Sequence, residues 1–171
     1  MLNKITIVIP VKNPPNIDAF ISANSKLFSK YRIIVIDGGG GEKLKPFTEK
    51  YHRTSLSLSD ARSLGISMVK TPFTLNLDSD VILPEDFIPN ALKKLENKDV
   101  VVVSIEYERI QGHLPFGPSL WKTEWLQKLY DWRGWTEKMP ICECIWMWNR
   151  VHTSGKNIET LCMRAKHLKG I

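Results

Sequence analysis

The first third of the chain alternates between short apolar runs and a helical pattern of apolar positions. Residues 4–11 and 32–36 are apolar runs of strand length, each ending in polar or glycine residues. The apolar side chains between them recur at helical spacing: Ile17, Phe20, Ile21, Leu27, Phe28 and Tyr31. Asn16 stands where such a helix would be capped. Strand, helix and strand at this spacing predict a βαβ unit with parallel strands.

The middle of the chain continues the alternation of helices and strands. Residues 42–51 predict a short helix weakened by Pro46, and Ser59 or Asp60 is expected to cap the next helix. Residues 73–77 then form an alternating apolar run that predicts a strand.

Two further helices and two strands are expected in the second half. A helix should start after Pro84, with Glu85 and Asp86 in its first turn, and a strand should cover residues 99–107. Pro140 is expected to open a helix that ends at Gly155, with an apolar stripe of Ile141, Cys144, Ile145, Trp148 and His152. Residues 158–163 predict a last strand. The order predicts an α/β fold with a Rossmann-like, mostly parallel central sheet flanked by helices.

Composition narrows the class of protein. A chain of 171 residues that is 43% hydrophobic can bury a core as one domain, residues 1–171. The apolar run 5–9 is too short for a signal-peptide core or a membrane span, which predicts a cytoplasmic protein. A net charge of +6 favours anionic partners. Because Lys and Arg are not clustered as in nucleic-acid-binding tails, we do not expect a nucleic-acid partner.

The cysteines and tryptophans are clustered in the last third. Cys142, Cys144 and Cys162 are odd in number, and a zinc site made by the first two with His152 and His167 matches no common spacing. Reduced thiols are the simpler interpretation. All six tryptophans lie between positions 121 and 148. Tryptophan stacks on sugars, lies at membrane interfaces or fills cores. We expect most to pack and one or two to line an acceptor cleft.

Two aspartates follow the strand at 73–77. In extended backbone, Asp78 and Asp80 point to the same side, and two such charges ~4 Å apart repel by about 4 kcal/mol at an effective dielectric constant of about 20. Their oxygens suit a hard divalent cation such as Mg²⁺ or Mn²⁺, although an isolated Asp-Ser-Asp is more often a polar turn. Asn13 and Asp37 also follow strands, and ligands of such sheets bind beyond the carboxyl ends of strands. This convergence favours the metal hypothesis.

Two further features near these strand ends have open interpretations. The glycines at 38–41 would allow a ligand to approach the backbone, or they form a flexible turn. They are not a phosphate-binding loop, because no Lys-Ser or Lys-Thr follows. Arg62 lies near the amino end of a predicted helix, which suits an anion-binding role, or it is an ordinary solvated arginine.

Five segments in order carry a resemblance to a known family. They are the Val-Ile-Pro-Val-Lys-Asn of residues 8–13, the strand and glycine turn of residues 34–40, the Asp-Ala-Arg-Ser-Leu-Gly-Ile of residues 60–66, the Asp-Ser-Asp of residues 78–80 and the Gly-Trp-Thr-Glu of residues 134–137. Position 40 is glycine where the family usually has serine. From residue 5 to about 167 the chain resembles the inverting family 2 glycosyltransferases of the GT-A fold, which move a sugar from a nucleotide diphosphate.

The resemblance implies roles for the strand-end residues. Pro10, Val11, Asn13 and Asp37 would hold the nucleobase, usually uracil or guanine, and Arg62 would lie near the base or the diphosphate.

The resemblance also implies a metal site. Asp78 would face the ribose or the metal, and Asp80 would bind a manganese or magnesium ion that bridges the diphosphate. His167 stands where some members have an additional metal ligand; it would otherwise be a surface histidine in a basic tail.

The catalytic base is where the sequence departs from the family. The family's acceptor helix begins Glu-Asp, and the aspartate takes the acceptor proton. Matching Arg150 to the arginine downstream gives Glu143-Cys144 here, whereas an alignment shifted by one residue makes Glu143 itself the base. A buried thiol is a poor base, because burial raises its pKa. Glu143 is therefore the predicted base.

The resulting hypothesis is a metal-dependent, inverting glycosyltransferase. Residues 1–80 would bind the nucleotide-sugar donor, and residues 81–171 would bind a glycan, protein or lipid acceptor. The tryptophans and the basic C-terminus allow an acceptor at a membrane surface. The main competing hypothesis is a GT-A-like nucleotide-sugar-binding module without turnover. A nucleotidyltransferase is a further alternative, since related folds hold metals with similar carboxylates.

Overall fold

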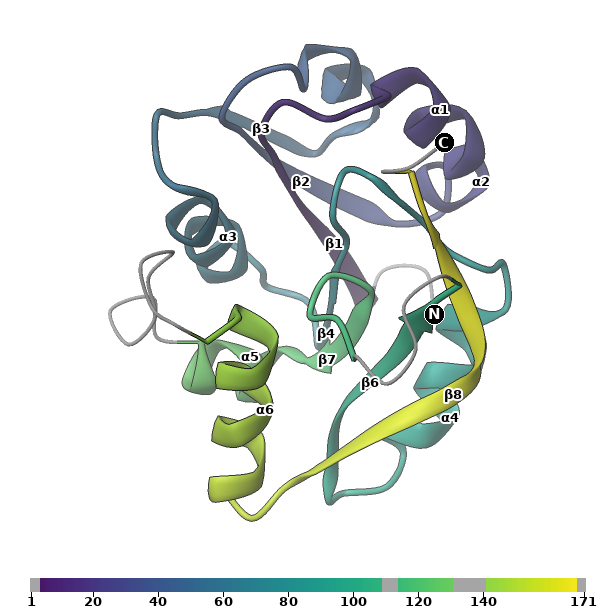
Figure 1. Ribbon diagram of the computed structural model, residues 1–171, viewed down its shortest axis with the longest axis vertical. Coiled ribbons are helices and arrows are strands. Elements are labelled where there is room, and N and C mark those ends of the chain that lie inside the picture. Colours follow the sequence, from purple (N-terminus) through teal and green to yellow (C-terminus); the bar gives the residue numbers. More distant parts are fainter. Residues whose placement is uncertain (1–3, 109–113, 131–140, 169–171) are drawn as a thin grey trace.

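The computed structural model describes residues 4–108, 114–130 and 141–168, which form an eight-stranded mixed sheet between two layers of helices (Figure 1). The strand order is β3-β2-β1-β4-β7-β6-β8-β5. The strands are β1 (Ile5–Val11), β2 (Arg32–Asp37), β3 (Lys50–Arg53), β4 (Phe73–Asn76), β5 (Val81–Ile82), β6 (Val100–Tyr107), β7 (Ser119–Lys122) and β8 (Asn157–His167). The predicted α/β class, with a mostly parallel sheet flanked by helices, is confirmed.

The parallel part of the sheet is the βαβ half of the chain. Strands β3, β2, β1 and β4 run parallel, while β7 runs antiparallel to both β4 and β6. Strand β8 returns parallel to β6 and finally pairs antiparallel with the short β5. The predicted parallel pairing of the first two strands is confirmed.

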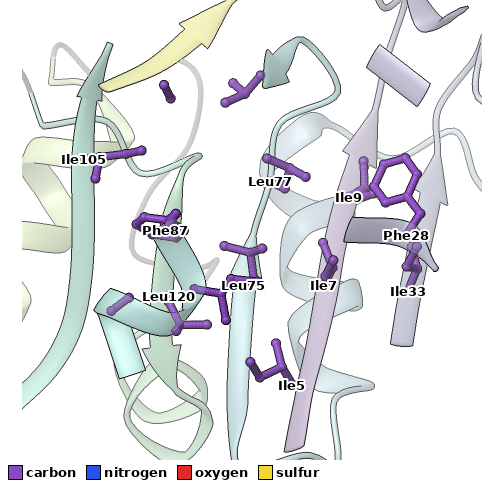
Figure 2. Packing of buried hydrophobic residues seen from close by; sticks show 14 of the residues in the cluster. Ile5, Ile7, Ile9, Phe28, Ile33, Leu75, Leu77, Phe87, Ile105 and Leu120 are labelled. Carbon is purple, nitrogen blue, oxygen red and sulfur yellow. The ribbon is translucent and has the colours of Figure 1, made fainter. Parts of the chain in front are cut away.

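One face of the sheet packs against helices α1 (Ile17–Ala23), α2 (Ser25–Phe28) and α4 (Phe87–Leu95), and the other against α3 (Leu58–Ser67), α5 (Thr123–Leu129) and α6 (Glu143–Thr153). On β1, Ile5, Ile7 and Ile9 point into the first layer, beside Leu75 and Leu77 of the β4 segment (Figure 2). Because successive side chains of a strand point to opposite faces and both faces are covered, β1 is buried along its whole length.

The capping residue of α1 is the predicted one. The Asn16 side chain accepts a hydrogen bond from the Ala19 amide at 3.0 Å. The predicted helix is not continuous, however, because Asn24 interrupts it and separates α1 from α2. The buried Asn24 amide donates to the Phe20 and Val81 carbonyls, both at 3.0 Å, and so ties the break to β5.

Three local predictions in the first half were wrong. Residues 42–51 form a 3₁₀ helix, η2 (Glu42–Phe47), followed by strand β3 rather than one α-helix. Helix α3 is capped by Ser57, whose hydroxyl accepts from the Asp60 amide at 3.1 Å, rather than by Ser59 or Asp60. Helix α4 begins at Phe87, so the acidic pair at 85–86 precedes its first turn.

The second half departs further from the prediction. Strands β5 and β7 and helix α5 were not predicted, and β8 is longer than residues 158–163. Helix α6 starts at Glu143 with Cys142 as its cap. Its buried face is formed by Cys144, Met147 and Val151 with Trp146, whereas Ile145 is 47% exposed, so the predicted apolar stripe was wrong.

The described tryptophans are mainly packing residues. Trp121 and Trp146 are buried, and Trp125 and Trp148 are half-buried against the same cluster. The other two, at positions 132 and 135, lie outside the described residues. Within the residues that the structure describes, no helix is both long and apolar enough to cross a membrane.

The contact between α3 and β1 is tight enough to test. A Cβ at Gly65 would lie 2.5 Å from Cγ1 of Val8 and 3.2 Å from Cγ1 of Ile36. We expect Gly65→Ala to lower the free energy of unfolding by about 1–3 kcal/mol, since the helix must shift to admit one methyl group. Ser67→Ala at the exposed end of the same helix should change it by less than about 0.5 kcal/mol. Equal urea midpoints for the two variants would contradict the packing described.

Candidate active site

A cleft of about 130 Å³ lies at the carboxyl ends of the parallel strands. The pairing of Val11 with Asp37 and of Val8 with Asn76 brings the ends of β1, β2 and β4 to one edge of the sheet. We call this hollow the strand-end cleft; its lining includes Pro10, Asn13, Leu58, Asp78, Asp80 and His167. The convergence expected from the sequence is therefore present.

The loops after β1 and β2 are tied together at this edge. The Gly38 amide donates to the Val11 carbonyl at 2.8 Å, and the Asn13 amide donates to the Gly39 carbonyl at 2.9 Å. Asn13 has φ +50° and Gly39 has φ +135°, so the turn needs residues that tolerate the left-handed region. Asn13 is exposed in the strand-end cleft, while Val11 lies beneath it at 1% exposure. The glycine run is thus an ordered turn.

Asp37 organises the glycine turn from below. It is fully buried, and its Oδ1 accepts from the amides of Gly39 at 2.8 Å and Gly41 at 3.1 Å. The Tyr51 hydroxyl donates to Oδ2. Burial, together with this carboxylate, raises the pKa of Tyr51 and keeps it a donor. Both of its oxygens thus accept hydrogen bonds within the protein, and the contact of Asp37 with a nucleobase stays a prediction.

The Asp-Ser-Asp segment forms a turn that delivers its second carboxylate to the cleft. The Val81 amide donates to the Asp78 carbonyl at 3.1 Å, and the Leu168 amide donates to the Asp80 carbonyl at 2.7 Å. Pairing of Val81 with His167 between β5 and β8 places Nε2 of His167 3.5 Å from Oδ2 of Asp80. All three predicted metal ligands therefore line the strand-end cleft, and two of them, Asp80 and His167, are in contact there.

The donor set fits a divalent cation only in part. Within the described residues, no group of three or more His, Cys, Asp or Glu side chains is arranged to hold a metal ion. An aspartate and an imidazole are nevertheless suitable ligands for Mn²⁺, and such ions are often held by one or two carboxylates with substrate phosphates completing the shell. Asp80 and His167 thus fit a cation that shares its coordination with a bound substrate.

The first aspartate is turned toward a buried arginine. Nη2 of Arg62 lies 2.6 Å from Oδ1 of Asp78, and Arg62 is only 3% exposed. Gly117 backs the carboxylate so closely that a Cβ there would lie 2.2 Å from Oδ2 of Asp78. Arg62 is therefore neither a solvated arginine nor part of the cleft lining; it is the counter-ion of Asp78.

The same guanidinium holds the predicted base. Nη1 of Arg62 donates to Oε2 of Glu143, the first residue of α6, and the Tyr130 hydroxyl donates to Oε1. Burial lowers the pKa of Arg62, but the Glu143 and Asp78 carboxylates outweigh it and raise that pKa well above its ordinary value. Arg62 thus stays charged and joins the aspartate of the cleft to Glu143.

An aromatic residue supports this ion-pair network. The Arg62 guanidinium lies 5.3 Å from the centre of the Phe116 ring, and the Tyr130 ring stacks on Phe116 at 5.5 Å with an interplanar angle of 8°. Sequence reasoning did not identify Phe116, Gly117 or Tyr130. The Gly-Pro dipeptide at 117–118 signals a turn, but nothing local marks Tyr130 as a partner of Glu143.

The thiol beside Glu143 is not a base at neutral pH. Burial and a hydrogen bond with the Cys142 thiol raise the pKa of Cys144 to about 12. This agrees with the expectation that Cys144 cannot replace the family's aspartate. The segment at 134–137, which resembles another family motif, lies outside the described residues.

Comparison with known proteins gives one family match. A family model described as "Glycosyl transferase family 2" matches residues 6–154. A curated protein of Streptococcus pneumoniae serotype 4, "Glycosyltransferase GlyA", is 26% identical over 145 residues, which covers 75% of this chain and 20% of that protein.

Solved structures agree in fold. Residues 1–349 of S. aureus TarS in complex with UDP-GlcNAc superpose with a TM-score of 0.72 at 13% identity, covering 98% of this chain and 61% of that chain. A mannosyltransferase from Pyrobaculum calidifontis, PcManGT, in complex with GDP-Man and Mn²⁺ gives a TM-score of 0.73 at 14% identity, covering 98% of this chain and 58% of that chain. At these identities the likeness shows the GT-A fold alone. The chain spans a fifth of the curated relative and about three fifths of these structures.

Removing the guanidinium that Asp78 and Glu143 share should destabilise the folded protein. We expect Arg62→Met to lower the free energy of unfolding at pH 7 by about 3–5 kcal/mol, because Asp78 and Glu143 lose their counter-ion. Urea titrations of the wild type and the variant at pH 7 measure this loss.

A matched control is available on the surface. Arg53 pairs with Glu42 at 3.1 Å, but its side chain is 70% exposed. Arg53→Met should therefore cost less than about 1 kcal/mol. A loss in Arg62→Met as small as in this control would show that the buried pairs do not hold the site together.

Proposed function

The chain belongs to glycosyl transferase family 2, and from this membership we propose that it moves a sugar from a nucleotide-diphosphate donor to an acceptor hydroxyl with inversion. The observation that carries the proposal is the meeting of Asn13, Asp80 and His167 in one cleft at the ends of parallel strands. The division into a donor half, residues 1–80, and an acceptor half, residues 81–171, is part of the proposal. His167 is an exception to this division, because it belongs to the second half in sequence but its Nε2 lies 3.5 Å from Oδ2 of Asp80 in the first half.

The nucleotide is proposed to lie over the β1 and β2 turns. Pro10 and Asn13 would contact the base directly, whereas Val11 and Asp37 would shape the turn from beneath. PcManGT is described with GDP-Man and Mn²⁺ and TarS with UDP-GlcNAc, which supports a nucleotide-sugar donor of one of these two kinds.

Dependence on Mn²⁺ or Mg²⁺ rests on Asp80 and His167. These two side chains would hold the cation, which when bound neutralises negative charge on the leaving diphosphate. The Asp78 side chain is 31% exposed at the same cleft, and Arg62 holds its Oδ1, so the carboxylate would face the ribose or the cation from its exposed side.

Glu143 is proposed as the general base. It would accept the proton of the acceptor hydroxyl while the hydroxyl oxygen attacks the anomeric carbon and the bond from that carbon to the diphosphate oxygen breaks. One in-line displacement of this kind inverts the configuration. The 14% of the Glu143 side chain that is exposed is the part an acceptor would reach. The acceptor is proposed to be a glycan, protein or lipid hydroxyl.

One observation is also compatible with a second function. Both carboxylate oxygens of Glu143 already accept a hydrogen bond, one from Arg62 and one from Tyr130. A domain that binds a nucleotide sugar without transferring it would also be compatible with a carboxylate used in this way. Binding and transfer must therefore be measured separately.

Binding is tested by calorimetric titration of UDP and GDP with and without Mn²⁺. We expect one nucleotide to bind more tightly with the metal, and Asp80→Asn to remove that gain, raising Kd at least about tenfold, or about 1.4 kcal/mol. Asp99→Asn, an exposed aspartate before the amino end of β6, is the control and should keep the gain. If neither nucleotide binds in any metal, the proposed donor site is wrong.

Transfer is tested by release of UDP or GDP from UDP-GlcNAc and GDP-mannose in the presence of candidate acceptors. Glu143→Gln should lower kcat by about 10²–10⁴ and leave nucleotide binding unchanged. Glu124→Gln on the exposed face of α5 is the matched control. Wild-type binding without turnover would favour the binding module, whereas full activity of Glu143→Gln would place the base elsewhere.

A further inference from the structure

Tyr130 lies where it can control the orientation of Glu143. It follows α5 as its capping residue, is 6% exposed, and donates its backbone amide to the Leu126 carbonyl at 2.8 Å. Its ring stacks on Phe116 and meets the edge of Trp146 at 6.0 Å and 84°. The ring therefore has little freedom to turn.

The end of α5 is also fixed relative to α6. Nε of Arg150, on α6, donates to the Leu129 carbonyl at 2.6 Å, next to Tyr130 in the chain. The Arg150 guanidinium in turn lies 5.1 Å from the centre of the Trp146 ring, on the same helix. Glu143 is the first residue of α6. The hydrogen bond from Arg150 to Leu129 is therefore a second link between the elements that carry Tyr130 and Glu143.

The Tyr130 hydroxyl has one proton and two acceptors in reach. The Ser59 carbonyl oxygen is 3.3 Å away, whereas Oε1 of Glu143 is closer and carries charge. A charge-assisted hydrogen bond to a carboxylate is the stronger of the two. Burial, together with Glu143, raises the pKa of Tyr130 despite the opposing effect of Arg62, so the phenol keeps its proton throughout the neutral range.

The two donors reach Glu143 from different elements. Arg62 of α3 takes Oε2, and Tyr130 takes Oε1. If Arg62 were its only partner, the Glu143 carboxylate could rotate about one hydrogen bond. With Arg62 and Tyr130 both bound, the plane of the carboxylate is fixed, and so is the direction of its remaining lone pairs. We propose that Tyr130 is a positioning residue that aims the Glu143 carboxylate at the acceptor hydroxyl.

This inference rests on the proposed role of Glu143, and Tyr130→Phe tests it with little risk to the fold. The substitution keeps the ring on Phe116 and removes only the hydroxyl. We expect kcat to fall about tenfold, equivalent to about 1.4 kcal/mol, with KM for the nucleotide sugar unchanged, because only the proton-transfer step loses its geometry.

The matched control is Tyr31→Phe. Tyr31 is half-buried and precedes β2 at its amino end, opposite the strand-end cleft. The substitution Tyr31→Phe should leave both kcat and KM unchanged. A fall in kcat shared by both variants would mean a general loss of stability and would overturn the assignment.

A double-mutant cycle separates positioning from an independent effect. In the Glu143→Gln background, Tyr130→Phe should cause no further loss of kcat, because the group through which it acts is gone. Additive losses would overturn the inference. The same cycle on the urea midpoint needs no turnover: non-additive midpoints support the contact, and additive midpoints contradict it.

The outcomes also separate this inference from the proposed function. If wild type fails to release UDP or GDP from any sugar donor, the proposed function fails and the positioning role falls with it. If wild type turns over, Glu143→Gln is inactive and Tyr130→Phe is fully active, the function stands and only the role of Tyr130 is wrong.

Discussion

One buried guanidinium, that of Arg62, connects the parts of the candidate active site. Placing a charge at 3% exposure is costly unless its partners are well aligned, and here the partners are carboxylates from two distant segments, Asp78 and Glu143. The ion pairs can form only if α3, the end of β4 and the start of α6 are all in place. The site is therefore complete only when these three elements are folded together. If one of them is displaced, at least one charged side chain of the network loses its partner.

The sheet topology explains how so short a chain gathers these groups. Parallel strands β1, β2 and β4 place their carboxyl ends at one edge, which gives the turn residues and the Asp-Ser-Asp segment. The antiparallel β7 runs back from the same edge, so the Phe116-Gly117 turn that precedes it lies against Arg62 and Asp78. Strand β8 then returns along β6 (Figure 1). It also pairs with β5, which brings His167 to Asp80. The pairing of β1, β2, β4 and β8 thus sets the positions of the turn residues and of His167, while helices α3 and α6 bring Arg62 and Glu143.

Sequence reasoning succeeded where the signal was local. The strand before Pro10, the strand ending at Asp37 and the Asn16 cap are all determined by residues close in sequence, as is the position of the two aspartates at a strand end. It failed for β7, α5 and the pairing of Arg62, because these depend on contacts between residues far apart. Arg62 reads as a solvated or ligand-binding arginine until Glu143, 81 residues away, is placed beside it. The contact of Tyr130 with Glu143 could not be predicted, since a tyrosine between leucine and aspartate has no distinctive local pattern.

The hydrogen bonds to Glu143 do not by themselves decide between an enzyme and a binding module. A carboxylate has about four lone-pair sites, and Arg62 and Tyr130 use one on each oxygen, which leaves room for an acceptor hydroxyl on the exposed side. Two fixed donors restrict the direction of those remaining sites rather than removing them. Cys144, by contrast, is buried with its pKa raised to about 12 and contributes no base at neutral pH. Of these two neighbours at the start of α6, Glu143 is therefore the one proposed as the base. In that proposed role, the direction in which Arg62 and Tyr130 hold its carboxylate would decide which acceptor hydroxyls it could serve.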